Sequence, residues 1–468
     1  MVIIAVVFLF SRIAYYLLGI SMTIGGWLLN QSFLKTDLLQ SIFYLHIQPP
    51  MMNLLYGILM KFFGDYWLMY AHIIFIALGL CLSISLFLLM RRLGVSPSWS
   101  LFFSMLFIIS PPSILYENYF SYIYPSATML CVAALFLHKF ITVWKWKNGC
   151  IFFFLLTALI LTSSFFHPIW FFAIVVLFIT LFSNRRTMIL KLAAVPFLIV
   201  LLWYGKNIYL FGTTAGSSWL GMNLAKTTIE SFSQVEREKL AQGGIISALS
   251  LRAVANPSSK FQNLVSTAKT GIKVLDEKIN DSGAQLNHLS YIPISKQLLK
   301  DSLRVIAWDP ERYLRKAVAP AFYIYFLPAS RFNFVRDNNG KISLYSRIFD
   351  NVVYGGFRHT AGLGMSIRNV LDLGFFIIAA YVIVFLSATK ELYDYFIKHN
   401  RAEFTPAYIT TLLFILGSVT YVMIISNLLE LGENMKYRFM TDPIFFVFLI
   451  VILYKMKKNR FNFLKKRF

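Results

Sequence analysis

The feature that most constrains this chain is a series of apolar runs, most of them as long as a bilayer core is thick. A helix needs about 20 apolar residues to cross that core. The composition agrees, because 58% of the residues are hydrophobic and only 14% are charged, whereas a soluble domain is about half apolar and a quarter charged. We therefore predict an all-α, polytopic integral membrane protein with about 10 transmembrane helices. The predicted spans are residues 2–23, 68–90, 99–116, 122–142, 149–164, 167–183, 188–210, 367–388, 405–427 and 440–456.

The net charge of +23 raises the question of a nucleic-acid partner. The lysines and arginines lie largely in short loops between spans and in the C-terminal tail, which is the distribution that the positive-inside rule describes. We therefore expect membrane lipids and no nucleic acid as partners. With both termini in the cytoplasm, the loops that face inward are residues 91–92, 138–147, 184–191 and 390–401.

The chain divides into three predicted parts. Residues 1–211 form an N-terminal transmembrane module, residues 212–366 an outer helical region, and residues 367–468 a C-terminal transmembrane module with a basic cytoplasmic tail. The outer region is too long for a plain connector.

Within the outer region we expect helices at residues 228–249 and 290–304, and a further helix that Asp309-Pro310 opens. The apolar segment 317–329 is flanked by basic residues and would rise only about 20 Å as a helix. This is shorter than the roughly 30 Å bilayer core, so we predict an interfacial or re-entrant helix there.

The first outer loop, Asp37 to Asn53 with the sequence DLLQSIFYLHIQPPMMN, is unusually polar for a connector between two spans. It holds a carboxylate, a histidine, a glutamine, a diproline and an asparagine. Polar groups at a bilayer surface need water, partners or a function. Plainer readings stay open, since Asp37 suits a helix N-cap and His46 suits an interfacial residue.

The same topology places the other unusual polar residues on the outer side, which favours one shared cavity. Alternatives remain: Glu117 suits a cap or an ion pair, Lys206 can reach the headgroups, and Glu433 with Arg438 can form a structural pair. The clustered residues are Asp37, His46, Gln48, Glu117, Asn118, His167, Lys206, Asn207, Glu430, Glu433, Asn434, Lys436 and Arg438.

Five motifs carry a family resemblance: residues 44–53 (YLHIQPPMMN), 116–125 (YENYFSYIYP), 203–212 (WYGKNIYLFG), 218–224 (SWLGMNL) and 430–443 (ELGENMKYRFMTDP). In this order they resemble a bacterial family of hydrophobic proteins with a Tyr-Leu-His-x-Gln-Pro-Pro-x-x-Asn first loop. More broadly, the chain resembles polytopic glycosyltransferases of the GT-C superfamily, such as the protein mannosyltransferases and the lipid A aminoarabinose transferase.

The resemblance implies an inverting glycosyltransferase of the bacterial inner membrane. A sugar would pass from a polyprenyl-phosphate-linked donor to an acceptor hydroxyl on the outer face. The resemblance assigns Asp37 as general base and Glu117 as reserve base or metal ligand. It leaves a divalent cation, Mg or Mn, open, and also the sugar and the acceptor. Residues expected to bind substrate are His46, Gln48, Asn53, Lys206, Asn207, Glu433, Asn434 and Arg438.

One departure from the family pattern concerns the base. Many relatives carry a second acid beside the first-loop aspartate, whereas here Asp37 is followed by two leucines. Glu117 is the candidate for the missing carboxylate. Lys206 and Arg438 are expected to bind the donor phosphate, for which arginine offers a two-pronged grip.

Other function classes stay open. A transporter or flippase would place polar or broken spans near the bilayer midplane and often shows internal repeats, which we do not find. A surface-polysaccharide polymerase or ligase would share the lipid-linked donor. A membrane acyltransferase would need a catalytic histidine, and neither His72 nor His138 lies in a supporting motif.

Overall fold

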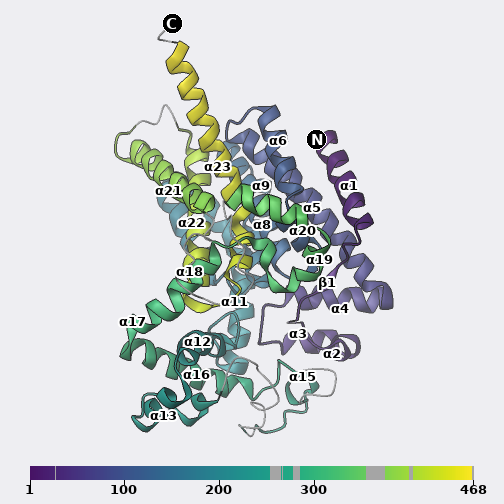
Figure 1. Cartoon of the computed structure of the whole chain (residues 1–468), viewed down its shortest axis with the longest axis vertical. Coiled ribbons are helices and arrows are strands. Elements are labelled where there is room, and N and C mark those ends of the chain that lie inside the picture. The colour runs from purple at the N-terminus through teal and green to yellow at the C-terminus, as the bar shows by residue number, and fades with distance from the viewer. Residues whose placement is uncertain are drawn as a thin grey trace.

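The computed structural model describes residues 1–26, 28–252, 265, 267–277, 285–354, 375–399 and 404–465. Almost all regular structure in these ranges is helical (Figure 1), as the sequence predicts. The described strands are β1 (Thr23–Ile24) and β2 (Tyr119–Phe120), which pair in parallel with Thr23 opposite Tyr119. This short ladder fixes the chain after the first helix against the chain before the eighth.

A bundle of helices forms the body of the molecule. Its members are α1 (Val2–Leu17), α4 (Met51–Phe63), α5 (Trp67–Arg92), α6 (Pro97–Ile108), α7 (Pro111–Glu117), α8 (Ile123–Val143), α9 (Trp146–Thr162), α10 (Pro168–Leu181), α11 (Arg186–Phe211), α21 (Phe375–Phe396), α22 (Pro406–Leu429) and α23 (Asn434–Lys465). The start of α1 and the end of α23 lie at the same end of the bundle (Figure 1). We call the opposite end the distal end.

The bundle is that of a helical membrane protein. Among the described residues, six helical segments are long and apolar enough to cross a membrane, or seven if α6 and α7, bent by 57°, count as one span. Helices α1, α9 and α10 are apolar but shorter. Each of the ten predicted ranges overlaps a helix, although residues 367–374 lie outside the described part, and only six or seven segments reach spanning length.

One bundle helix was not predicted from the sequence. Helix α4 lies in the stretch expected to be an outer loop, and it continues through a single turn into α5. Pro50 occupies its N-cap position. A proline is tolerated at a helix start because the first amides have no partner inside the helix. The diproline therefore marks where a helix begins.

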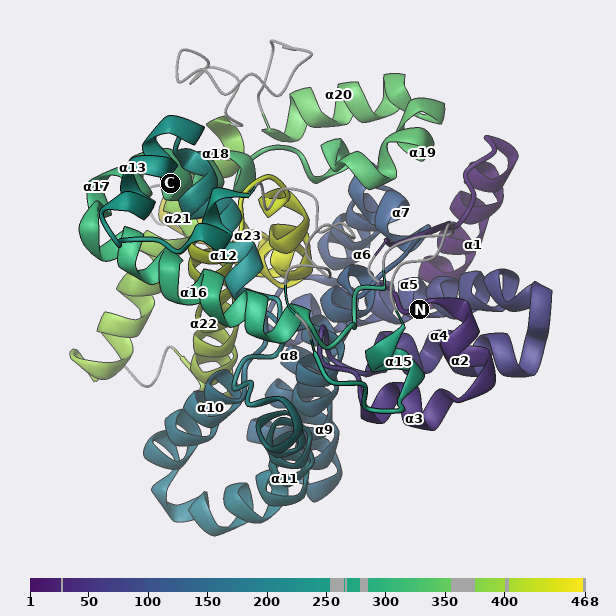
Figure 2. The same cartoon turned by 90° about the horizontal axis from the view of Figure 1, so that it is seen from below.

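A second set of helices, most of them short, covers the distal end (Figures 1 and 2). They are α2 (Gln31–Thr36), α3 (Leu38–Phe43), α12 (Leu220–Thr228), α13 (Gln234–Gln242), α15 (Lys273–Asp276), α16 (Tyr291–Trp308), α17 (Pro310–Tyr313) and α18 (Ala319–Tyr325). The predicted helical stretch 228–249 is confirmed in part: α12 ends at Thr228, and the stretch then holds α13 between two short 3-10 turns instead of one continuous helix. Ser233 starts α13 through a capping box with Glu236. The helix predicted to open at Asp309-Pro310 is confirmed as α17, where the Asp309 side chain accepts the Arg312 amide at 2.9 Å.

The packing of α12 on α16 explains one motif glycine. Any Cβ at Gly221 would overlap the backbone carbonyl of Ser295. Glycine is the residue that permits two backbones to approach this closely. The glycine of the SWLGMNL motif is therefore required by helix packing.

The segment predicted to be interfacial forms a π-helical turn (Leu314–Val318) followed by α18. It is not among the helices long enough to span a membrane. After it, α19 (Arg336–Lys341) and α20 (Ser343–Tyr354) lie at the edge of the molecule, beside the bundle helices (Figures 1 and 2).

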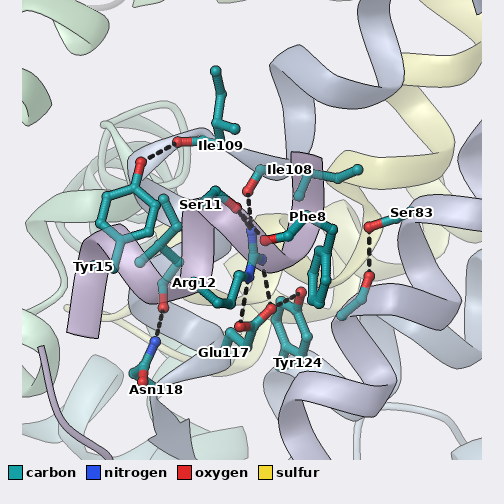
Figure 3. A network of polar contacts seen from close by, with 12 residues as sticks. Phe8, Ser11, Arg12, Tyr15, Ser83, Ile108, Ile109, Glu117, Asn118 and Tyr124 are labelled. Carbon is teal, nitrogen blue, oxygen red and sulfur yellow. Dashed lines mark hydrogen bonds and ion pairs between the residues drawn. The ribbon is translucent and has the colours of Figure 1, made fainter. Parts of the chain in front are cut away.

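A buried ion pair attaches α1 to the bundle (Figure 3). Arg12 Nε lies 2.8 Å from Glu117 Oε1 and its Nη2 2.6 Å from Oε2, and Tyr124 donates to Oε2 at 2.9 Å. Gly79 on α5 makes room, because a Cβ there would overlap the Glu117 carboxylate. A charge at membrane depth needs such a partner, and this two-pronged pair supplies it.

The break between α6 and α7 supplies further attachment points for α1. Proline at 111 and 112 removes two backbone donors, so carbonyls before the break lack helical partners. Arg12 donates to the Ile108 carbonyl at 3.3 Å, and Tyr15 donates to the Ile109 carbonyl at 3.2 Å (Figure 3). These side chains satisfy backbone groups that lipid cannot.

Replacing Arg12 by methionine should destabilise the protein by about 3–5 kcal/mol, because the Glu117 carboxylate is then buried without its cation. The double variant Arg12→Met with Glu117→Met should recover most of that loss, since neither charge then needs a partner. Thermal unfolding of purified protein in detergent measures both. An Arg12→Met variant as stable as the wild type would contradict the role given to this pair.

Candidate functional site

A cavity of about 920 Å³ opens at the distal end of the bundle. This is within the range of small-molecule sites. Four of the five motifs contribute to its lining: Gln48 and Pro49 from the first, Tyr122 from the second, Trp219 and Asn223 from the fourth, and residues 430–433 and 435–437 from the fifth. Segments far apart in the sequence therefore meet at one place.

One wall of the cavity carries a group of titratable residues, of which five form what we call the acid–base cluster: Tyr122, Lys226, Glu430, Glu433 and Lys436. Glu433 forms an ion pair with the largely buried Lys436. Burial raises the pKa of Glu430, against the opposing charges of Lys436 and Lys226. A carboxyl with a raised pKa beside cations is suited to exchange protons near neutral pH.

The stretch that leads into α19 and ends at its first residue adds two more cations to the lining. Arg331 and Arg336 come from residues 329–336, and Arg336 is exposed. We call this pair the arginine rim. With Lys226 and Lys436 it brings the cavity to four cationic side chains against two carboxylates in the lining. An anionic substrate would be favoured there.

His46 builds the wall that carries Gln48. Its Nδ1 lies 2.7 Å from Ser218 Oγ and its Nε2 lies 3.0 Å from the Asn287 carbonyl. A carbonyl only accepts, so Nε2 carries the proton and Nδ1 accepts from the serine. Burial lowers the pKa of His46 to about 3, so the ring is neutral. His46 is thus a structural tie between the first loop and the outer helices.

Asn287, which no sequence signal indicated, completes that tie. Its Oδ1 accepts the His46 amide at 2.9 Å, and its Nδ2 donates to the Tyr44 carbonyl at 3.0 Å. Ser218 in turn donates its amide to the His46 carbonyl at 2.9 Å. The YLHxQPP and SWLGMNL motifs therefore contact each other directly.

Asp37, predicted as the base, lies outside the cavity lining. It is exposed at the junction of α2 and α3 and accepts the Gln40 amide at 3.3 Å. This is the N-cap geometry that was the plainer reading of Thr36-Asp37.

Lys206 and Asn207, near the end of α11, also lie outside the lining. The ammonium of Lys206 donates to the Phe43 and Leu45 carbonyls at 2.8 and 3.0 Å. It thereby satisfies acceptors at the end of α3. The buried Asn207 accepts the Thr213 amide with its backbone carbonyl, at the end of α11.

Arg438, the second predicted phosphate ligand, is fully buried, and each nitrogen of its guanidinium has a partner within the protein. It donates to the carbonyls of Tyr325 and Leu327 at 2.8 and 3.0 Å, and its Nη2 lies 2.6 Å from Tyr354 Oη. Its Nε faces Asp442 at 3.2 Å. The guanidinium holds α18 and α20 to α23.

Of the remaining predicted site residues, some line the cavity and the others form structural contacts elsewhere. Gln48 and Glu433 line the cavity. Glu117 is paired with Arg12, and Asn53 accepts the Leu29 amide at 2.8 Å. Asn434 stabilises the turn between α22 and α23, because its side-chain amide donates to the carbonyls of Ser426 and Glu430.

Among the cavity-lining residues to which sequence reasoning gave no binding role are Tyr122, Lys226, Arg331, Arg336, Glu430 and Lys436. Three of them lie in quoted motifs, which is the signal that could have found them. Lys226 and the two arginines lie between motifs. No group of three or more His, Cys, Asp or Glu side chains that could hold a metal ion occurs within the described ranges.

Comparison with known protein families, with curated proteins and with solved structures finds no match to this chain.

Replacing His46 by alanine should loosen the outer helices from the first loop. The change leaves the Ser218 hydroxyl and the Asn287 backbone carbonyl without the imidazole as their partner, which costs about 2 kcal/mol. Limited proteolysis of the purified protein should then cut the outer region faster than in the wild type. Equal protection in both proteins would show that the tie is unimportant.

The same tie should weaken with acid. The pKa of His46 in the folded protein, about 3, lies below the ordinary histidine value of 6.5, so the unfolded state binds the proton more readily. Its stabilisation is complete above pH 6.5 and is lost as the pH falls from there towards 3. Protection from proteolysis should therefore fall between pH 7 and pH 5 in the wild type. Glutamine does not titrate in this range, so a His46→Gln variant should not show this pH-dependent loss of protection.

Proposed function

We propose that this protein is an inverting, polyprenyl-phosphate-dependent glycosyltransferase whose chemistry takes place in the distal cavity. The observation that carries the proposal is the convergence of four motifs on a cavity with four cations and two carboxylates. The proposed topology has about ten crossings, both termini in the cytoplasm and the cavity on the outer face of a bacterial inner membrane.

The chemistry needs a base for the acceptor and positive charge for the leaving phosphate. Glu430 is the proposed base, because it lines the cavity and burial raises the pKa of its carboxyl. It takes the proton of the acceptor hydroxyl while that oxygen attacks the anomeric carbon. The bond from that carbon to the phosphate oxygen breaks, and polyprenyl phosphate leaves with the electron pair. Cations in the lining stabilise the developing phosphate charge.

We prefer Glu430 to Asp37 as the base because of where the two carboxylates lie. Asp37 caps a helix on the surface, whereas Glu430 faces Lys436 and Lys226 inside the cavity. Glu433 is the second carboxylate of the site, and its ion pair with Lys436 orients both groups. This arrangement supplies the acid that is missing beside Asp37 in the first loop.

The Glu430→Gln variant should lose transfer by about 10²- to 10⁴-fold, the usual contribution of a general base. The measurement is release of free polyprenyl phosphate by the protein in liposomes, with a panel of polyprenyl-phosphate hexoses and pentoses as donors. Glu238→Gln, the same change on the exposed face of α13, is the matched control and should turn over normally.

Asp37→Asn decides between the two carboxylates. Asparagine is as good an N-cap as aspartate, so the fold should be kept. Full loss of transfer in this variant, with normal turnover in Glu430→Gln, would place the chemistry outside the cavity. Sugar flux across the liposome without phosphate release would favour a transporter instead.

A further inference from the structure

The turn between α9 and α10 lines the cavity with uncharged groups. Residues 162–165, Thr-Ser-Ser-Phe, all belong to the lining, and we call them the hydroxyl turn. Helix α9 ends at Thr162, and α10 begins at Pro168. The lysines, arginines and glutamates of the lining belong to other elements. The hydroxyl turn thus offers a ligand hydroxyl groups and one aromatic ring, but no charge of its own.

The hydroxyl of Ser163 lacks a partner in the fold. The residue is 1% exposed, and its hydroxyl oxygen has no hydrogen-bond partner among the residues that the structure describes. Its backbone groups are paired, because the amide donates to the Leu159 carbonyl at 2.9 Å and the carbonyl accepts the Phe166 amide at 3.1 Å. Buried hydroxyls are usually paired, and an unpaired one costs free energy. A serine side chain turns among three staggered positions, so a hydroxyl group that enters the cavity would supply the missing partner.

Phe165 connects the hydroxyl turn to the acid–base cluster. Its half-buried ring lies 4.0 Å from the ring of Tyr437, centroid to centroid. The Tyr437 hydroxyl is hydrogen-bonded to that of Tyr122, and the Tyr437 ring lies 4.9 Å from the ammonium of Lys436. Tyr122 and Lys436 are members of the cluster that contains Glu430, the proposed base. A single residue, Tyr437, therefore joins the aromatic ring of the turn to this cluster.

The chain before α12 packs against the hydroxyl turn. A Cβ at Gly216 would lie 3.2 Å from both the Cα and the Cβ of Ser164, closer than ordinary van der Waals contact. Glycine is the residue that permits this approach. Ser217 and Trp219, which follow in the chain, line the cavity too. The turn is therefore held by two elements, by α23 through Phe165 and by this chain through Ser164, and a binding site held in this way is preorganised.

We propose that the hydroxyl turn binds the transferred sugar and that this sugar is an uncharged pyranose. The inference rests on the proposed function and names the class of its donor. The C–H groups on one face of a pyranose can pack on an aromatic ring such as Phe165, and the hydroxyl groups at its edge are partners for Ser163. An amino sugar or a uronic acid would bring a charge that the turn cannot pair, and an unpaired charge is costly to bury.

The Ser163→Ala variant separates a ligand-binding hydroxyl from a structural one. The hydroxyl has no partner in the free protein, so its removal should not lower the Tm measured in detergent. In liposomes, kcat/KM for polyprenyl phosphate release should fall about three- to tenfold, the value of one neutral hydrogen bond. Ser183→Ala, at an exposed position between α10 and α11, is the matched control and should change neither quantity. A lower Tm in Ser163→Ala would show that the hydroxyl serves the fold, and would overturn its assignment to the sugar.

Donors that lack one sugar hydroxyl provide a second test of Ser163. The donors are the neutral sugar that the wild type uses best and its monodeoxy derivatives, each linked to polyprenyl phosphate. Ser163→Ala should lower kcat/KM for every donor except the one that lacks the hydroxyl in contact with the serine, because that interaction is already absent there. Equal losses across the series would mean that Ser163 acts only through the structure, and the assignment would be wrong.

The Phe165→Leu variant tests the aromatic ring. Leucine keeps an apolar side chain beside Tyr437 but has no flat face, so kcat/KM should fall about three- to tenfold, whereas Phe165→Tyr should keep the wild-type value. Phe154→Leu, at a 47% exposed position on α9, is the matched control. Normal turnover by Phe165→Leu would contradict the role given to the ring.

Charged donors separate this inference from the proposed function. The panel contains polyprenyl phosphates that carry glucose, galactose, mannose or xylose, and two that carry glucosamine or glucuronic acid. If the wild type turns over only the last two, the proposed function stands and this inference fails alone. If it releases polyprenyl phosphate from no donor, the proposed function fails together with the inference.

Discussion

The cavity depends first on the neutral imidazole of His46. It accepts from Ser218 and donates to Asn287, and so joins the first loop to the outer helices. On either side of it, Gln48, Ser217 and Trp219 face the cavity. A charged imidazole could not accept from the serine. Burial keeps the ring neutral, and the neutral ring reinforces the backbone hydrogen bonds that join His46 to Ser218 and Asn287.

The positions of the helices were largely predictable from the sequence, because bilayer thickness sets a length that apolar runs reveal. Helix α4 was missed because the polar and proline-rich stretch before it suggested a loop. The break at Pro111 was missed for the opposite reason. The run from 99 to 116 is apolar enough for one span, so a single helix was predicted there, although Pro111 and Pro112 mark the place where the structure bends.

The site was less predictable, because a polar residue near a membrane can either hold the fold together or line a binding site. Arg12 and Glu117, 105 residues apart, satisfy each other, and Arg438 satisfies carbonyls more than 110 residues away. Such long-range partners leave no local pattern. Sequence reasoning could find the polar residues that gather at the distal end. It could not tell which of them form structural hydrogen bonds or ion pairs and so are not available to a substrate. Glu430 and Lys436 were visible in a motif, whereas Lys226 and the arginine rim become visible only once α12 and α19 are in place.

The break between α6 and α7 has a consequence for how the periphery of the molecule is held. Tyr15 from α1 and Tyr345 from α20 both donate to the carbonyl of Ile109. A carbonyl oxygen has two lone pairs, so one backbone group can serve both helices. Helices α1 and α20, more than 300 residues apart in the sequence, thus share the Ile109 carbonyl oxygen as a hydrogen-bond acceptor. A movement of either helix would change the hydrogen bonding of that oxygen, so the kink couples the N-terminal helix to α20.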